Sequence, residues 1–283
     1  CLVLLVGVLS VMHLGGIENY IIKRDGQSLH GAIFSAFGLY LNWYEGQTGW
    51  LPGSWDVLWS LSIEEVFYLG FPLVCLLTRR ARYLVPLLIL LALSLPISRA
   101  ALASNEIWQE KAYLPGMAAI AMGILAALAV EKYRMAPAWI ARALCSVGAI
   151  GVLAVFFTGR EVWRAIGNGG MLLLTFSAAC LIIGLHWTAA RGASTAVPGT
   201  GWLRSFGRLS YEVYLSHMFV VFAVVAAFKA SGAGMGNGFI WYLPATVLCW
   251  LLGAAIARWF STPVDRSLRQ SLLKPELESL AST

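Results

Sequence analysis

The stretch 59–68 places two adjacent carboxylates, Glu64 and Glu65, inside an apolar segment long enough to cross a membrane. An ionisable side chain at bilayer depth costs about 2.5–3.5 kcal/mol even on the mildest insertion scale, so such a residue is first considered functional. At helical spacing Ser60, Glu64 and Tyr68 share one face, whereas Glu65 points about 100° away. The spacing predicts a hydroxyl, a carboxylate and a phenol that hydrogen-bond one another away from lipid.

A second polar seam lies far downstream, where Ser210, Tyr214 and His217 recur at helical spacing. A neutral imidazole takes a proton from a hydroxyl near physiological pH, so His217 is a candidate general base. The alternative is a hydrogen-bonded core histidine without a catalytic role. For Glu64 the corresponding alternative is a structural carboxylate paired with an arginine or a backbone donor.

The elements that must position these residues are membrane helices. The chain is 59% hydrophobic and 12% charged, whereas soluble domains are about 45–50% apolar. Apolar segments of spanning length lie at 57–78, 82–100, 112–130, 139–158, 165–188, 208–228 and 239–260, and a shorter one covers 1–13. We therefore expect an all-α polytopic transmembrane helix bundle with eight spans. Residues 31–43 are too short a run to cross and are expected to form a re-entrant or interfacial element.

The charge distribution predicts the orientation of this bundle. With eight spans, most of the 20 Lys and Arg residues, including Arg79 and Arg80, fall on one side. The positive-inside rule makes that side cytoplasmic, with residues 14–56 outside and the C-terminal tail inside. The net charge of +6 comes from cations on short loops without a basic stripe, so no nucleic-acid partner is expected. The five cysteines show no paired spacing, so neither disulfides nor a metal site is expected.

Two motifs resemble those of the acyltransferase-3 family of membrane O-acyltransferases. The signature Ser-Leu-x-x-Glu-x-x-Phe-Tyr is matched by Ser60, Leu61, Glu64, Phe67 and Tyr68. Residues 206–217 are similar to the family's Gly-Arg-x-Ser-Tyr-x-x-Tyr-Leu-x-His segment. The resemblance implies ten helices with both termini inside, so the first helices are expected to lie upstream of an N-terminally truncated chain. Residues 1–262 are then the transmembrane acyltransferase domain, and 263–283 form a short cytoplasmic tail.

Members of the family transfer an acyl group, usually acetyl from acetyl-CoA, to a hydroxyl of a sugar or glycan. The resemblance thus implies acyl-CoA as co-substrate, and a cell-envelope or lipid-linked carbohydrate as acceptor at a bacterial inner membrane. The site residues that it implies are the following: Glu64 and His217 as catalytic groups, Ser60, Tyr68, Tyr211 and Tyr214 at the substrate, and Arg79, Arg80 and Arg208 at the phosphates of CoA. The alternative for Arg208 is an i, i+4 ion pair with Glu212.

Two departures from the family pattern keep other functions open. The family's proposed catalytic histidine, on its first helix, and an Arg-x-x-Arg motif are not among these residues, and Ser261-Thr262-Pro263 stands where Glu-x-Pro is common. The alternatives are a non-catalytic relative and a proton-coupled transporter or glycan-lipid flippase with Glu64 and His217 as a relay. The lack of an obvious repeat disfavours a transporter. Nothing in the sequence selects the acceptor glycan, the acyl chain length or the oligomeric state.

Overall fold

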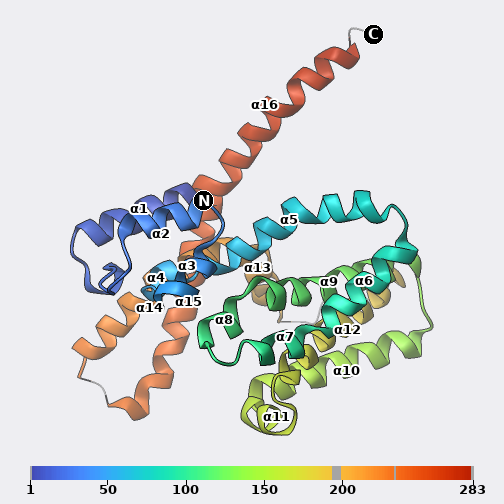
Figure 1. The fold of residues 1–283 in the computed structure, drawn as a ribbon, viewed down its shortest axis with the longest axis horizontal. Coiled ribbons are helices and arrows are strands. Elements are labelled where there is room, and N and C mark those ends of the chain that lie inside the picture. Colours follow the sequence, from blue (N-terminus) through green and yellow to red (C-terminus); the bar gives the residue numbers. More distant parts are fainter. Residues whose placement is uncertain (1, 193–198, 233, 282–283) are drawn as a thin grey trace. The chain divides into compact units, whose positions relative to one another are not determined.

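The computed structural model describes residues 2–192, 199–232 and 234–281, and this part of the chain consists of helices and turns without a strand (Figure 1). The expected all-α fold is confirmed. The contacts within the chain define two compact units. Unit 1 is Cys1–Lys23, Leu51–Val57 and Pro198–Thr283, and unit 2 is Arg24–Trp50 and Leu58–Val197.

Seven of the expected spans are recovered as helices in the described residues. Six helical stretches are long and apolar enough to cross a membrane: Gly53–Thr78, Glu106–Lys132, Ala138–Phe157, Gly169–Ala190, Ser210–Ala230 and Gly236–Ser271. The seventh is a bent pair, α6 (Ala81–Leu93) and α7 (Leu95–Ala101), which meet at 45°. Pro96 lacks the N–H that would bond the carbonyl of Ala92, which explains the break. The segment expected at 1–13 forms α1 (Leu2–Leu14), only 13 residues long, so its crossing stays a prediction, and Cys1 lies outside the described residues.

Unit 2 contains the first signature motif. Its helices besides α6 and α7 are α2 (Leu29–Phe37), α3 (Leu41–Thr48), α5 (Trp59–Thr78), α8 (Glu106–Lys111), α9 (Tyr113–Lys132), α10 (Ala138–Phe157), α11 (Gly159–Ile166) and α12 (Gly169–Ala190). The segment 31–43 thus lies in two short helices, α2 and α3, rather than in one span.

Small residues bring α10 and α12 into backbone contact. A Cβ added to Gly148 would lie 2.5 Å from the amide nitrogen of Leu181, and one added to Gly184 would lie 2.7 Å from that of Cys145. Membrane helices pack through such small residues because lipid offers no hydrophobic drive for association. Elsewhere in unit 2, Leu88 and Ala121 are buried between α6 and α9. The shorter helix α3 contacts α5 and α8, and α8 contacts α7 and α9.

Unit 1 contains the second motif. Its elements besides α1 are η1 (Glu18–Tyr20), α4 (Gly53–Asp56), α13 (Gly201–Arg208), α14 (Ser210–Ala230), η2 (Met235–Trp241), α15 (Tyr242–Ile256), the π-helical η3 (Ala257–Ser261) and α16 (Thr262–Ala281). The ring of Tyr20 lies 5.7 Å from that of Phe219 and 5.6 Å from that of Phe222, which joins the N-terminal segment to α14. Residues expected as a short tail are helical through Ala281, and residues 282 and 283 lie outside the described residues.

Candidate functional site

Helix α5 positions the first motif. It runs from Trp59 to Thr78 and is predominantly apolar, and helical spacing puts Ser60, Glu64 and Tyr68 on successive turns of one face. The Glu64 side chain is half-buried, Glu65 is exposed, and the Tyr68 ring is 60% exposed. Phe67 stacks on Phe71 with ring centroids 5.0 Å apart, which fixes the aromatic side of the motif.

The hydrogen bonds expected within this motif are not present in the described residues. The Oγ of Ser60 is buried without a partner, and the carboxylate of Glu64 makes neither a hydrogen bond nor an ion pair with any described residue. Buried or half-buried polar groups in folded proteins are almost always satisfied by a partner. The oxygens of Ser60 and Glu64 are therefore unsatisfied within the described residues.

The turn after α5 carries two of the cations expected at CoA. Arg79 ends the helix in a left-handed conformation, with φ +48°, and its Nε donates to the carbonyl of Leu76 at 3.3 Å. Arg80 precedes the first residue of α6, and both arginine side chains are exposed. Arg79 therefore has a structural part, closing the helix end, beside any part in binding phosphate.

His217 lies half-buried on α14 in unit 1. Its Nδ1 is 2.6 Å from the carbonyl oxygen of Tyr214. A carbonyl oxygen only accepts hydrogen bonds, so this contact requires a proton on Nδ1. In the neutral ring the lone pair is then on Nε2, the nitrogen that is able to take a proton from a hydroxyl.

The other residues of the second motif surround this histidine in sequence but differ in exposure. The Tyr211 and Tyr214 side chains are 45% and 36% exposed, and the Tyr214 ring centroid lies 6.0 Å from that of His217. Arg208 is exposed at the end of α13, and the described residues contain no ion pair between Arg208 and Glu212. Glu64 belongs to unit 2 and His217 to unit 1, so each motif is described within its own unit.

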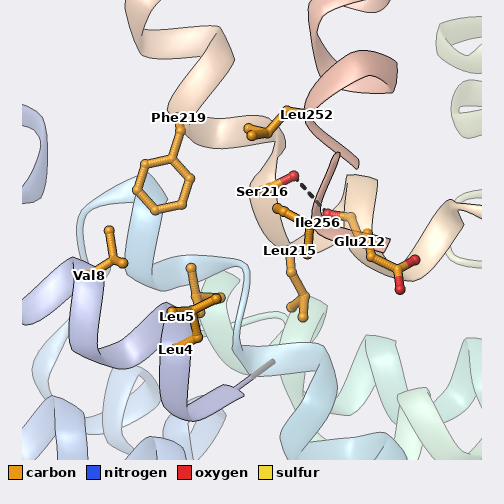
Figure 2. Close-up of a pocket in the computed structure, with 9 residues that line it drawn as sticks. All are labelled: Leu4, Leu5, Val8, Glu212, Leu215, Ser216, Phe219, Leu252 and Ile256. Atoms are coloured by element: carbon orange, nitrogen blue, oxygen red, sulfur yellow. Dashed lines mark hydrogen bonds between the residues drawn. The ribbon is translucent and has the colours of Figure 1, made fainter. Parts of the chain in front are cut away.

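An apolar slot of about 270 Å³ lies beside the His217 helix within unit 1. Figure 2 shows Leu4, Leu5 and Val8 of α1 facing Leu215 and Phe219 of α14. Its lining is completed by Glu212, Ser216, Leu252 and Ile256. The hydroxyl of Ser216 donates to the backbone carbonyl of Glu212 at 2.7 Å, while the carboxylate of Glu212 points away from the apolar side chains (Figure 2). Such a lining accommodates hydrocarbon better than a charged or sugar group.

Unit 2 also contains a buried ion pair that the sequence reasoning missed. The Nζ of Lys111, on α8, lies 2.9 Å from a carboxylate oxygen of Glu45 on α3, and the two side chains are 2% and 0% exposed. The ammonium lies 4.1 Å from the ring centroid of Trp50 and 5.9 Å from that of Trp59. The amide of Asn42 donates to the backbone carbonyl of Lys111 at 3.0 Å. This desolvated charge pair fixes α3 against α8.

No local sequence pattern predicts that pair, because its members are 66 residues apart in the chain. The available signal was weaker: Glu45 is an acid in an aromatic stretch with Trp43, Tyr44 and Trp50. In the described part of the chain, no three His, Cys, Asp or Glu side chains gather in a group able to hold a metal ion.

Comparison with known proteins gives one match. The family model of an acyltransferase domain matches residues 28–259, which includes both motifs and most of the chain. No curated protein and no solved structure matches the chain. The resemblance drawn from the two motifs is therefore confirmed at the level of the family.

Proposed function

The chain belongs to this family of membrane acyltransferases, and we propose that it transfers an acetyl group from acetyl-CoA to a hydroxyl of a cell-envelope or lipid-linked carbohydrate. The observation that carries the proposal is that both motif residues able to move a proton keep a reactive atom without a partner in the described chain. These atoms are the carboxylate oxygens of Glu64 and the Nε2 of His217. Side chains that served only to hold the bundle together would be expected to use these atoms in hydrogen bonds.

The proposed reaction is an acyl transfer from a thioester. The acceptor hydroxyl oxygen attacks the thioester carbonyl carbon, its proton passes to a base, the C–S bond breaks, and the CoA thiolate takes up a proton. In this proposal His217 accepts the hydroxyl proton at Nε2, because its Nδ1 proton is held by the Tyr214 carbonyl. Glu64 is the second proposed catalytic group, whose unpaired carboxylate accepts a proton or stabilises positive charge. Ser60, Tyr68, Tyr211 and Tyr214 contact the acceptor.

The donor and the membrane orientation belong to the same proposal. Arg79, Arg80 and Arg208 are exposed cations, and we assign to them the phosphates of CoA. By the positive-inside rule we assign these arginines and the C-terminus to the cytoplasmic side of a bacterial inner membrane. Acetyl-CoA is available on that side. The interior of a helix bundle protects the thioester from hydrolysis before the acetyl group is transferred.

The function is tested on the full-length protein, purified in detergent and supplied with acetyl-CoA and cell-envelope glycans. We expect release of free CoA and an acetyl-sized mass increase of the glycan in mass spectrometry. Glu64→Gln and His217→Ala should each abolish both signals, whereas Glu65→Gln should retain them. Glycans of unchanged mass in the presence of active donor would contradict the proposal.

The orientation is tested by labelling single cysteines in a variant whose native cysteines are replaced by alanine. We expect Asp25→Cys to react with a membrane-impermeant maleimide on intact cells, because residues 14–56 are assigned outside. Ser267→Cys should react only after permeabilisation. Asp25 and Ser267 are both exposed in the structure, so access by the membrane side alone should decide the labelling. The reverse pattern would show the opposite orientation.

A further inference from the structure

Unit 2 has a second hollow, about 580 Å³ in volume, that the reaction as proposed does not use. Its size lies within the range of about 300–1,000 Å³ that is typical of small-molecule sites. It lies where α3, α7, α8 and the start of α9 meet. The residues around it are Trp43, Gln47, Ser98, Ala101, Leu102, Trp108, Ala112, Tyr113 and Leu114.

The lining combines aromatic faces with uncharged polar groups. The Trp43 and Trp108 rings are 5.0 Å apart at an interplanar angle of 74°, so they form a corner, and Trp43 is 53% exposed. Beside them lies Gln47, an exposed amide for which the described residues provide no hydrogen-bond partner. A pyranose ring has one face of C–H groups, which stacks on an indole, and a rim of hydroxyls, which bind an amide. Hydrocarbon would leave the amide unused.

Contacts with the neighbouring helices hold the Trp108 ring of this corner in place. A Cβ added to Gly46 would lie 2.4 Å from the Trp108 ring, so this indole rests directly on the backbone of α3. Asn105 accepts a hydrogen bond from the Trp108 amide and donates to the Gly46 carbonyl. The guanidinium of Arg99 donates to the Gln109 carbonyl at 2.9 Å, which joins α7 to α8.

The buried Glu45–Lys111 pair acts on the same junction, because it fixes α3 against α8, the two helices that carry Trp43 and Trp108. A tryptophan that only marks the membrane boundary needs no such fixation. A ligand site benefits from it, since a ring held in place before binding loses less freedom on binding.

We propose that this hollow is the acceptor subsite, in which a sugar ring of the carbohydrate stacks on Trp43 and hydrogen-bonds to Gln47. The proposal rests on the proposed function and locates its acceptor. Both α3 and the α7–α8 connection belong to segments that the charge distribution assigns to the outer face, from which an envelope glycan would approach.

The test uses the full-length protein in detergent with Trp43→Ala, Gln47→Ala and the control Trp163→Ala. Trp163, on α11, is 51% exposed and is expected at the same membrane face. It therefore matches Trp43 in residue type, exposure and membrane face, but it does not line the hollow. Two readouts are taken: binding to an immobilised array of neutral and N-acetylated oligosaccharides, and the acceptor and donor KM in acetyl transfer.

We expect Trp43→Ala to raise the acceptor KM by about tenfold or more, as loss of a stacking platform does for other ring ligands. The donor KM should stay within about twofold, Trp43→Phe should recover part of the loss, and Trp163→Ala should resemble the parent. Gln47→Ala, a change at an exposed position without a described partner, provides the same test if Trp43→Ala fails to fold.

The outcomes separate this proposal from the one on which it rests. Array binding that depends on Trp43, without acetyl transfer to any glycan, would support the subsite and contradict the transfer function. Transfer with an acceptor KM that neither Trp43→Ala nor Gln47→Ala changes would overturn the subsite and leave the function standing. Equal array binding by Trp43→Ala and Trp163→Ala would also overturn it.

Discussion

Two carboxylates of unit 2 differ in burial and in whether they have an ionic partner. Glu45, on α3, is fully buried and lies 2.9 Å from the ammonium of Lys111, which is itself packed on Trp50. Glu64, on α5, is half-buried and has no partner among the described residues. A charge that is buried and paired holds elements together, whereas a charge that is half-buried and left unpaired remains available for chemistry.

The difference shows why a membrane acid alone does not identify a site. Both residues are acids in predominantly apolar surroundings, and the cost of burying a charge applies to each of them. Only the partner distinguishes their functions, and the partner of Glu45 comes from a helix far along the chain. The two carboxylates should consequently respond in opposite ways to neutralisation.

The largest loss of stability is expected when the Glu45–Lys111 ion pair is broken. Lys111→Met leaves the Glu45 carboxylate buried without its cation, which costs about 3–5 kcal/mol of unfolding free energy. Thermal unfolding of the purified protein should show a strongly lowered Tm and loss of folded material. The double variant Glu45→Leu/Lys111→Met removes both charges and should recover most of the loss. A Lys111→Met variant as stable as the parent would show that the ion pair does not stabilise the fold.

A large effect on rate, but not on stability, is expected at the unpaired carboxylate. Glu64→Gln should shift the unfolding free energy by less than about 0.5 kcal/mol, because no described contact is lost. Acyl transfer should fall by about 10²–10⁴-fold, the usual contribution of a general acid–base group. The adjacent and exposed Glu65→Gln serves as the control and should be near parental in both measurements. Loss of stability in Glu64→Gln would place it with Glu45 instead.

The smallest effect is expected at Arg79, which has both a structural and a proposed binding part. Its left-handed φ of +48° costs an L-residue about 1–2 kcal/mol, and glycine adopts this conformation freely. Arg79→Gly should therefore leave stability unchanged or raise it by up to about 1 kcal/mol, while the donor KM rises a few fold. Arg79→Lys retains the charge and should keep the donor KM. A parental KM in Arg79→Gly would remove this residue from the CoA site.

The sequence was sufficient for the helices and for the family. Long apolar runs dictate their own secondary structure in lipid, so the expected segments are recovered as helices. The bend at Pro96, within the segment 82–100, was not predicted. The two motifs led to the family because each is a dense local string of specific residues. Periodicity also placed Ser60, Glu64 and Tyr68 on one face correctly.

What the sequence could not provide are contacts between residues far apart in the chain. The expected hydrogen bonds within the first motif are not formed by the described residues, because sharing a helix face brings side chains near one another without bonding them. Trp43 and Trp108 lie on different helices, and only their mutual angle shows that they form a corner. Periodicity carries no information about such pairs, since it describes one helix at a time.

The distance of 66 residues between Glu45 and Lys111 also orders events during synthesis. At about 5–20 residues per second, Glu45 leaves the ribosome roughly 3–13 s before its cation. An unpaired carboxylate cannot be buried meanwhile without the full desolvation cost, so α3 has to stay at the wet membrane surface until α8 arrives. The junction between α3 and α8, which carry Trp43 and Trp108, thus forms late, after α5, α6 and α7 have already been made.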